Sequence, residues 1–306
     1  MNHLVAIVGP TGIGKSSLAL HLAQIFNGEI VSADSRQVYC YMDIGTAKPD
    51  PEELALVPHH LINIVDPSDS FSLAQYQALA YQAVKDIQQR DKLPFLVGGS
   101  GLHIWAVLEG WRIPQVEPDP GFRHNLEKIA ADTGPDELFQ QLTEIDPDAA
   151  QRIDRRNVRR VIRALEVRKK SDIPFPQLQR KEAPLFNTLI IGLTADRAGL
   201  YRRIDQRVDD MIERGLVNEV EKMVNMGYDF NLPAMSGIGY RQIGLFLKRE
   251  LTMASAIQQI KFETHRFVRH QYAWFRLKDE RIRWFDIQRQ TDSEVETTIA
   301  EFIKSE

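Results

Sequence analysis

The sequence predicts an α/β fold, in which a parallel sheet core is interrupted by an all-helical insertion. Short apolar runs alternate with helical patterns over the N-terminal third, and a glycine-rich motif follows the first run. The strand pattern stops after Trp111 and resumes at Thr188. Strands that alternate with helices imply a parallel sheet with right-handed crossovers. We therefore expect the core at 1–112 and 188–306 and the helical insertion at 113–187.

The expected strands are short apolar runs. Buried strands are predicted at residues 4–8, 29–33, 94–97 and 188–193, because these runs are rich in apolar and β-branched residues. Two weaker candidates lie at 61–65, where Asn63 interrupts the run, and at 282–285. These segments would supply the strands of one sheet.

Apolar residues at helical spacing predict helices at 16–26, 72–90, 200–226 and 253–277. Ser72 is the expected N-cap of the second of these. The buried face of that helix is expected to carry Leu73, Tyr76, Leu79 and Ala83. In the insertion, residues 122–168 predict helices that break at Gly134-Pro135 and at Pro147.

The composition limits the class of protein. A chain of 306 residues with 43% hydrophobic content can bury a sizeable core. Its formal net charge of −4 predicts no nucleic-acid partner, so such a partner would need a local basic patch. Cys40 is the only cysteine, which fits a reducing compartment, and no apolar run approaches the ~18 residues of a membrane helix. We expect a cytoplasmic monomer that contacts no membrane.

A phosphate-binding motif occupies residues 9–16. Its sequence, GPTGIGKS, fits the P-loop pattern G-x-x-x-x-G-K-[ST] and lies between a predicted strand and a predicted helix. Its glycines allow backbone N–H groups to converge on phosphate oxygens, and the helix N-terminus adds positive potential. Lys15 should meet the terminal phosphate, and the Ser16 hydroxyl should meet Mg²⁺. A glycine-rich turn is the alternative, but motif and context favour a di- or triphosphate site.

The P-loop alone does not identify the phosphate compound. ATP-hydrolysing P-loop proteins usually place a Walker-B aspartate after another apolar strand, but the run at 93–97 ends in Gly-Gly-Ser-Gly. Asp34 closes the strand at 29–33 instead, at the sheet edge where ligands bind. A carboxylate there can accept a proton from a nucleophile that approaches the phosphate compound. An aspartate that only caps a turn is the alternative.

The segment 152–170, RIDRRNVRRVIRALEVRKK, is strongly basic. Nine Lys or Arg residues against two acids give it a charge of +7 (nine minus two) in a chain of net charge −4. At helical spacing, Val158, Ile162 and Leu165 are expected to form a buried face, with Val161 as a candidate fourth member. The outward surface would carry Arg152, Arg156, Arg159, Arg160 and Arg163. This pattern predicts contact with a phosphate backbone, and a solvated helix face is the alternative.

Seven motifs occur together along the chain: GPTGIGKS at 9–16, ADSRQVY at 33–39, MDIGTAKP at 42–49, LVGGSGLH at 96–103, RRVIRALEV at 159–167, GYRQI at 239–243 and HQYAWFR at 270–276. This combination resembles the tRNA dimethylallyltransferases, also called tRNA isopentenyltransferases, nearly end to end. The resemblance implies a P-loop-kinase-like core and a helical insertion that grips the tRNA anticodon stem-loop. The implied reaction transfers a dimethylallyl group from dimethylallyl diphosphate to the exocyclic amine of the adenosine 3′-adjacent to the anticodon.

The resemblance also implies roles for residues at matching positions. The diphosphate would be held by Gly9, Thr11, Gly12, Ile13, Gly14, Lys15, Ser16 and Arg123, with Mg²⁺ on Ser16. Catalysis would rest on Asp34, Ser100 and Lys15, with Ser100 in a position where the family more often has threonine. The tRNA would be contacted by Asp34, Ser35, Arg36, Gln37, Ser100, Arg123, Arg159, Arg160, Arg163, Gly237, Gly239, Tyr240, Arg241, Gln242, Arg269, Gln271, Trp274 and Arg276.

Some positions depart from the family pattern. His265 and His270 stand where arginines are expected, and Tyr41 stands where a small residue is common. A neutral histidine contacts phosphate more weakly than arginine does, so the C-terminal helix is expected to hold tRNA less tightly. These changes leave the P-loop and Asp34 intact, so the expected activity is unchanged.

Functions of two other classes explain parts of the sequence. A small-molecule or nucleoside kinase would use the P-loop and Asp34 but would leave the basic segment 152–170 without a role. A non-catalytic, nucleotide-dependent RNA-binding switch would use that segment but would give Asp34 no task. Prenyl transfer to adenylate or ADP is also open, and the basic insertion favours tRNA.

Overall fold

The computed structural model describes residues 2–114, 116–171, 181–289 and 292–305, and it divides the chain into two units. The first unit joins Met1–Leu108 to Leu185–Glu306, and the second unit is Glu109–Pro184. The insertion predicted at 113–187 starts four residues later and ends three residues later than this second unit. Its residues 115 and 172–180 lie outside the described part of the chain.

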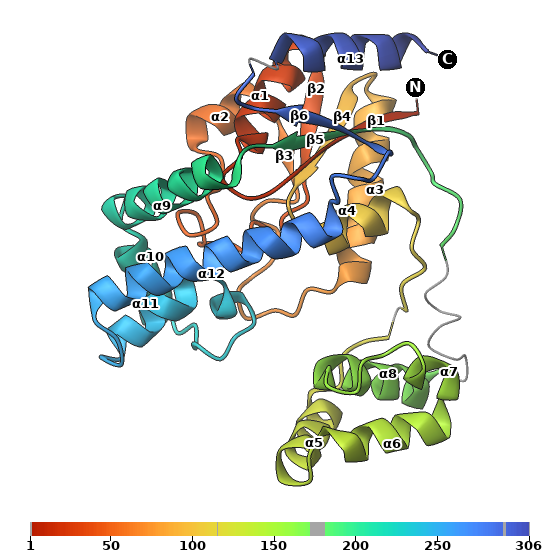
Figure 1. Cartoon of the computed structure of the whole chain (residues 1–306), viewed down its shortest axis with the longest axis vertical. Helices are drawn as coiled ribbons and strands as arrows, with labels where there is room; N and C mark the ends of the chain where they lie inside the picture. Colours follow the sequence, from red (N-terminus) through yellow and green to blue (C-terminus); the bar gives the residue numbers. More distant parts are fainter. Residues whose placement is uncertain (1, 115, 172–180, 290–291, 306) are drawn as a thin grey trace. The chain divides into compact units, whose positions relative to one another are not determined.

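A six-stranded parallel sheet forms the centre of the first unit (Figure 1). Its strands are β1 (His3–Val8), β2 (Gly28–Ser32), β3 (His59–His60), β4 (Leu93–Gly98), β5 (Asn187–Thr194) and β6 (Ile282–Asp286). They lie in the order β3-β2-β4-β1-β5-β6, and every neighbouring pair is parallel. β1 and β4 are buried along their whole length, which explains their almost continuous apolar sequences. The predicted α/β class is confirmed.

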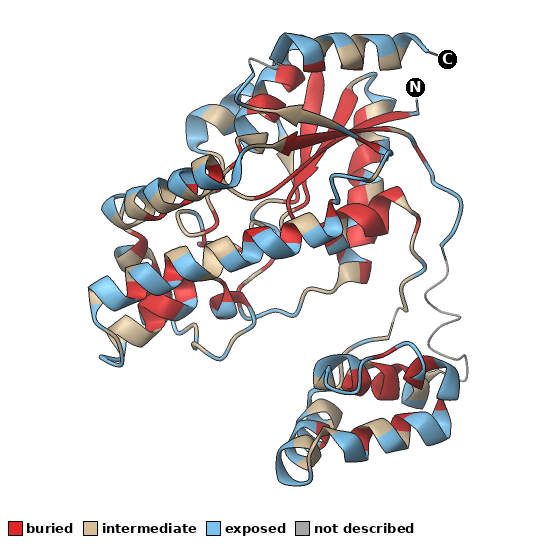
Figure 2. Ribbon diagram, in the orientation of Figure 1, coloured by how far each residue is buried: buried red, intermediate tan, exposed pale blue. Residues whose placement is uncertain are grey.

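Helices cover both faces of this sheet. They are α1 (Lys15–Ile25), α2 (Pro51–Leu56), α3 (Leu73–Gln89), α4 (Gly101–Leu108), α9 (Arg197–Glu213), α10 (Leu216–Asn225), α11 (Tyr240–Leu247), α12 (Met253–Trp274) and α13 (Asp292–Lys304). One apolar cluster joins Val5 and Phe95 of the strands to Leu22 of α1 and Ile299 of α13. Because strand side chains alternate, the intervening residues face the other side, where α3 and α4 pack. Figure 2 shows that the inner strands β1, β2 and β4 are buried, whereas β6 at the sheet edge is mostly of intermediate exposure.

A second apolar cluster lies among the C-terminal helices. It joins Val208, Leu216, Tyr240 and Ile260, from α9 to α12, with Met42 from the loop after β2. In Figure 1, the long α12 crosses below the sheet, and α9, α10 and α11 gather near one end of it. The cluster therefore ties the loop after β2 to helices that come much later in the sequence.

The second unit has a core of its own. Its helices are α5 (Pro120–Asp132), α6 (Pro135–Ile145), α7 (Pro147–Ala150) and α8 (Val158–Lys170). Leu126, Leu138, Val161 and Leu165 are buried together between them. Each of the first three helices has proline at its first position, where a missing N–H costs nothing, so the predicted breaks at Gly134-Pro135 and Pro147 are confirmed. The described residues of this unit form no strand beyond an isolated bridge between Trp111 and Lys181.

Some predicted elements are wrong. No strand forms at 61–65, because Leu61 and Asn63 have φ of 63° and 56° and turn the chain away from β3. The helix predicted at 200–226 is two helices, since Gly215 has a φ of 99° and starts α10 anew. The short helices α2, α4 and α11, and the terminal α13, were not predicted.

The helix predicted at 72–90 forms almost as expected. Ser72 caps α3, accepting from the Gln75 N–H at 3.2 Å, and the Gln75 side chain accepts from the Ser72 N–H at 2.8 Å. Its predicted buried face is partly wrong, because Leu79 is 38% exposed while Ala80 and Val84 are fully buried. None of the described helices combines the length and the apolar character that a membrane crossing requires.

Candidate active site at the carboxyl ends of the strands

The P-loop connects β1 to α1. Gly9, Gly12 and Gly14 have φ of 142°, 78° and 102°, a region that side chains with a Cβ rarely adopt. A Cβ on Gly9 would also lie 2.6 Å from the Leu193 carbonyl oxygen of β5. Gly14 is the N-cap of α1, so the unpaired N–H groups of the first helical turn belong to the loop. The loop therefore offers backbone donors to an anion.

Two cavities meet at this loop. The first, of about 430 Å³, is lined by Thr11, Gly12, Gly14, Lys15, Ser16, Ser17, Asp34, Gln37, Thr46, Ala47, Val97, Gly98, Gly99, Arg203, Gln206, Arg207, Asp210, Phe267 and Gln271. The second, of about 320 Å³, has more apolar walls, which include Ile204, Val208, Met211, Ile238 and Ile260. Both cavities are lined by Thr11, Asp34, Thr46, Arg207 and Phe267. The predicted diphosphate residues Gly9 and Ile13 line neither cavity, and Ile13 is in the apolar core.

Positive charge dominates the first cavity. The Lys15 ammonium donates to the Pro10 carbonyl at 2.8 Å. Burial and, to a smaller extent, the charge of Arg207 lower the pKa of Lys15 to about 7, and Asp34 opposes both effects. Burial also lowers the pKa of Arg207, again against the influence of Asp34. Three cations (Lys15, Arg203 and Arg207) and two carboxylates (Asp34 and Asp210) line this cavity, and a bound anion would stabilise the charged forms of the cations whose pKa values are lowered.

Asp34 follows β2 and lines both cavities. Its Oδ1 accepts from the Arg36 N–H at 2.8 Å, which is the turn-capping role considered above. Its Oδ2 accepts no hydrogen bond from the described residues, so one oxygen serves the turn and the other stays available. A Cβ on Gly98 would lie 2.2 Å from the Ala33 carbonyl, so glycine is what allows β4 to end this close to Asp34.

Ser100 joins the ends of β2 and β4. Its Oγ accepts from the Ser35 N–H at 3.2 Å, and its own N–H donates to the Ala33 carbonyl at 3.4 Å. Ser35 and Ser100 both line the second cavity. The predicted catalytic residues Lys15, at the start of α1, and Asp34 and Ser100, in the segments after β2 and β4, thus come to one site.

Sequence reasoning missed two arginines of α9. The Arg203 Nε donates to the Gly12 carbonyl at 3.1 Å, and Arg207 lines both cavities. They are four residues apart and therefore share a helix face. Their spacing was visible in the sequence, but only the packing of Ile204 against Gly12 brings that face to the P-loop.

Three predicted tRNA contacts have buried side chains. Gln271 accepts from the Thr11 N–H at 2.9 Å and donates to the Gly99 carbonyl at 3.0 Å. Gln242 accepts from the Gly239 N–H at 3.0 Å, and the Tyr240 hydroxyl donates to Glu219 at 2.5 Å. These side chains bond inside the fold, although Gln271 lines the first cavity and Tyr240 the second, and their predicted contact with tRNA remains a prediction.

Arg36 and Gln37 also bond within the protein. Arg36 Nη2 donates to Ser236 Oγ at 3.2 Å, and its Nη1 bonds the Pro233 carbonyl. Gln37 accepts from Ser32 Oγ at 2.8 Å and donates to the Ala47 carbonyl at 3.2 Å. Both residues connect the loop after β2 to neighbouring segments. Their predicted contact with tRNA remains a prediction.

The remaining predicted contacts of the core divide into two groups. Gly237 and Gly239 line the second cavity. Arg241, Arg269, Trp274 and Arg276 are exposed at the surface of the first unit. Arg269 donates to the Tyr201 hydroxyl at 3.2 Å, and Arg241 lies 3.7 Å from Glu263. These exposed groups are the ones that the structure leaves accessible to a large partner.

The basic helix of the second unit is partly neutralised. Glu166 is 1% exposed and accepts two bonds from Arg123, at 2.9 and 2.7 Å, and one from Arg163. Burial raises the pKa of Glu166, but hydrogen bonds from Arg123, Asp119 and Arg163 outweigh it and lower the pKa to about 2. The predicted outward orientation is therefore wrong for Arg163, which also bonds the Val116 carbonyl at 2.9 Å.

Other arginines of this segment stay exposed. Arg156 pairs with Asp154 at 3.0 Å, whereas Arg152, Arg159 and Arg160 are exposed on the helix and the turn before it. The ion pair of Arg123 lies within the second unit, and its predicted contact with the diphosphate remains a prediction. The acids of these pairs, Asp154 and Glu166, are the two already subtracted in the +7 of the segment, so the structure shows which arginines are paired and leaves that net charge unchanged.

The comparisons with known proteins agree with these observations. The family model described as IPP transferase matches residues 37–278. A tRNA dimethylallyltransferase of Roseiflexus sp. (strain RS-1) is 52% identical over 273 residues, which cover 89% of this chain and 90% of that protein. One of Dehalococcoides mccartyi is 47% identical and covers 98% of this chain and 92% of its own length.

Solved structures are also similar. The tRNA isopentenylpyrophosphate transferase of Bacillus halodurans has a TM-score of 0.73 and 40% identity, over 99% of this chain and 97% of that one. A eukaryotic dimethylallyltransferase, crystallised acting on tRNA, has a TM-score of 0.81 and 27% identity, over 98% of this chain and 78% of its own. The P-loop-kinase-like fold that the motifs implied is therefore confirmed. On the family model and these identities, the chain belongs to the IPP transferase family, the family of the tRNA dimethylallyltransferases.

Proposed function

We propose that this protein transfers a dimethylallyl group from dimethylallyl diphosphate to the exocyclic amine of the adenosine 3′-adjacent to a tRNA anticodon. The observation that carries the proposal is the pair of cavities that share Asp34 and Thr11. One has the cations and backbone donors that a diphosphate needs, and the other has apolar walls that suit a prenyl chain or a base. The names of the relatives support the same reaction.

The donor half of the reaction breaks the bond between the allylic carbon and the diphosphate oxygen. Negative charge then develops on the departing diphosphate. Backbone N–H groups of the P-loop, Lys15, and the α9 residue Arg207 surround the cavity in which this charge would form. Donors that are already in place where charge develops lower the barrier without reorganisation. These residues would therefore bind the diphosphate and promote its departure.

The acceptor half forms the bond between the adenine nitrogen and the allylic carbon. The exocyclic amine is a weak nucleophile, because its lone pair is delocalised into the ring. Its excess proton must leave as the new bond forms, and Asp34 Oδ2 is the free acceptor at the junction of the two cavities. The base has to leave its stack to reach this position.

We also propose a Mg²⁺ ion at the diphosphate. No group of three or more His, Cys, Asp or Glu side chains gathers as a metal site within the described residues. Mg²⁺ needs no such group here, because it is usually held by few protein oxygens together with substrate phosphates and waters. The exposed Ser16 hydroxyl on the cavity wall fits this requirement. When bound, the ion would neutralise part of the diphosphate charge.

The exposed cations support tRNA as the acceptor. Arg159 and Arg160 in the second unit, and Arg241, Arg269 and Arg276 in the first, are exposed cations among the predicted contacts. Arginine at such positions binds the phosphate backbone and positions the substrate without reading its sequence.

The decisive experiment combines radiolabelled dimethylallyl diphosphate, Mg²⁺ and bulk tRNA in the absence of ATP. Label should enter the tRNA, and digestion should place it on the adenosine next to the anticodon. Parallel reactions that replace tRNA with adenylate or ADP test prenyl transfer to a free nucleotide. Reactions that replace dimethylallyl diphosphate with ATP test the kinase and the nucleotide-dependent switch. Efficient tRNA-dependent release of phosphate from ATP, without prenyl transfer, would overturn the proposal.

A further inference from the structure

Residues 42–48, here called the wall segment, form part of both cavities. Thr46 and Ala47 line the first cavity, and Gly45 and Thr46 line the second. The segment belongs to no helix or strand, so regular backbone bonding does not hold it in place. Its position beside Asp34 must come from other interactions.

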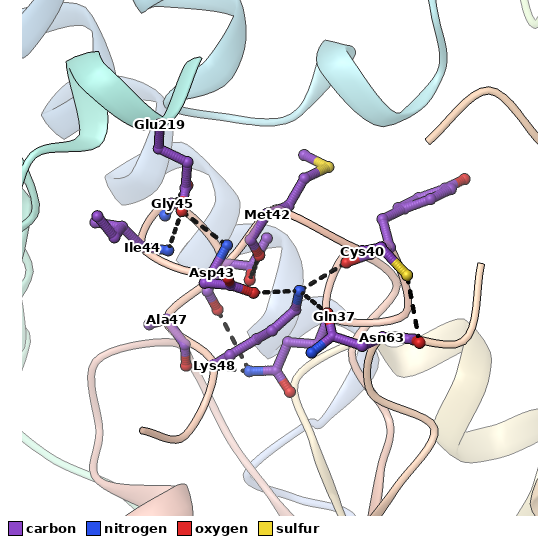
Figure 3. A network of polar contacts seen from close by, with 12 residues as sticks. Gln37, Cys40, Met42, Asp43, Ile44, Gly45, Ala47, Lys48, Asn63 and Glu219 are labelled. Atoms are coloured by element: carbon purple, nitrogen blue, oxygen red, sulfur yellow. Dashed lines mark hydrogen bonds and ion pairs between the residues drawn. The ribbon is translucent and has the colours of Figure 1, made fainter. Parts of the chain in front are cut away.

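One side of the wall segment is held by Glu219 of α10 (Figure 3). The Glu219 Oε2 accepts from the N–H groups of Asp43 and Ile44 at 2.9 and 2.7 Å. Its Oε1 accepts from the Gly45 N–H at 3.0 Å. Three consecutive backbone donors on one carboxylate are charge-assisted hydrogen bonds, which are stronger than neutral ones. A side chain more than 170 residues later in the chain therefore fixes this backbone.

The other side is held by Lys48, which is 8% exposed. Its ammonium donates to the Tyr39 carbonyl at 2.6 Å, to Asp43 Oδ1 at 2.7 Å and to Asn63 Oδ1 at 2.5 Å (Figure 3). An ammonium group has three donors, and all of them are used here. Asp43 takes part on both sides, through its side chain with Lys48 and through its N–H with Glu219.

Glu219 also fixes the residue that packs against the wall segment. Its Oε1 accepts from the Tyr240 hydroxyl at 2.5 Å, and a Cβ on Gly45 would lie 2.5 Å from the Tyr240 ring. Gln37 donates to the Thr46 and Ala47 carbonyls at 3.3 and 3.2 Å. The carboxylate therefore organises both the segment and the ring beneath it, next to the loop that carries Asp34.

We propose that Glu219 is a positioning residue for the acceptor, which holds Gly45–Ala47 where the adenosine must fit against Asp34. The inference rests on the proposed function. The acceptor is favoured over the donor because Glu219 bonds Gly45 and Tyr240, which line only the second cavity, whereas the P-loop and α9 supply the charged groups of the first. Loosening the segment should slow the transfer step and leave donor binding intact.

The test variant is Glu219→Gln. The amide keeps the size of the side chain, but its NH₂ cannot accept from an N–H group, so part of the clamp is lost. Glu221→Gln is the matched control, because Glu221 is exposed on the same helix. Three measurements are made on both variants and on the wild type: amide hydrogen exchange at residues 43–45, donor affinity, and single-turnover prenyl transfer with saturating tRNA.

Glu219→Gln is expected to lose exchange protection at 43–45 and to lower the single-turnover rate constant on the order of tenfold to hundredfold. Its donor affinity and its reaction amplitude should stay at the wild-type level, as should every property of Glu221→Gln. A merely structural role would lower the amplitude, because fewer molecules are folded, and would leave the rate constant of the active ones unchanged.

Three outcomes would overturn the proposal: protection retained, protection lost with an unchanged rate constant, or a loss of amplitude alone. If Glu219→Gln does not fold, Glu219→Asp keeps the charge on a side chain one methylene shorter, and the same pairing of exchange and rate applies to it. A wild-type protein that transfers no prenyl group would instead refute the proposed function, while hydrogen exchange would still test the clamp.

Discussion

The two units of this protein treat their cations in opposite ways. Around the P-loop, Lys15, Arg203 and Arg207 gather at a cavity with Asp34, and burial lowers the pKa values of Lys15 and Arg207. In the helical unit, the buried Glu166 binds Arg123 and Arg163 directly and has a pKa of about 2. The first arrangement leaves charge for a ligand, and the second uses it to hold helices together.

The difference shows why counting charges along the sequence is a weak guide to function. The basic segment 152–170 is the stronger signal in the sequence, and its +7 already allows for Asp154 and Glu166, but the count does not reveal that Arg163 is bound to the buried Glu166. The α9 residues Arg203 and Arg207 belong to no motif in the sequence, but both line the first cavity. A cation marks a ligand site when it is close to other cations in a cavity.

The largest expected effect is at Asp34. Asp34→Asn keeps an oxygen that can accept from the Arg36 N–H, so the turn should survive while the base is lost. Loss of a positioned general base costs about a hundredfold to ten-thousandfold in rate. Single-turnover prenyl transfer should fall by that factor, with donor affinity nearly unchanged. A rate within a few fold of wild type would reduce Asp34 to a turn cap.

In the helical unit the corresponding change is Glu166→Gln. Two arginines would lose their buried carboxylate, which should lower the free energy of unfolding of this unit by about 3 kcal/mol, the low end of the range because both guanidinium groups are partly exposed. Denaturant unfolding measures the change, with Glu127→Gln, an exposed glutamate of α5, as control. Donor binding to the core should not change. Equal stability of the two variants would contradict a structural role for Glu166.

The charge of Lys15 should be visible in the pH dependence of donor binding. Its pKa of about 7 in the ligand-free site means that it loses its proton as pH rises above 7. A diphosphate prefers the protonated lysine, so donor affinity should fall by about tenfold per pH unit above 7. Lys15→Arg stays charged and should show a flat profile over this range. Parallel profiles for the two proteins would assign the pH dependence to another group.

The smallest expected effect is on the salt dependence of tRNA binding. It should differ between the exposed arginines of the helical unit and those that are paired with acids. Arg159→Ala and Arg160→Ala should each make the slope of log tRNA affinity against log salt about 0.7–0.9 shallower, if each loses one phosphate contact. Arg163→Ala should lower stability and leave the slope unchanged, because its guanidinium already bonds Glu166 and the Val116 carbonyl. Equal slopes for all three variants and the wild type would mean that this helix face is solvated and contacts no phosphate.

Local patterns predicted most of the sheet and the helices of the insertion. Apolar runs placed β1, β2, β4 and β5, because a strand buried on both faces has a continuous apolar sequence. The run at 61–65 failed because Leu61 and Asn63 adopt left-handed backbone that an apolar pattern does not reveal. The prediction of one long helix at 200–226 is wrong because a new helix starts after Gly215. The helical spacing of apolar residues continues across this glycine and does not reveal the break.

The sequence by itself determined the P-loop, Asp34 after the second strand, and the helical insertion, because each depends on residues that are neighbours in the chain. Only the tertiary structure decided which side chains share the site. Arg207, Gln271 and Glu219 lie on three later helices. Arg207 lines a cavity together with the P-loop, Gln271 accepts from the Thr11 N–H, and Glu219 accepts from the Asp43 N–H. Whether a polar side chain faces a ligand or bonds the protein depends on how these helices pack. That packing is set by apolar contacts between distant segments, which no local pattern records.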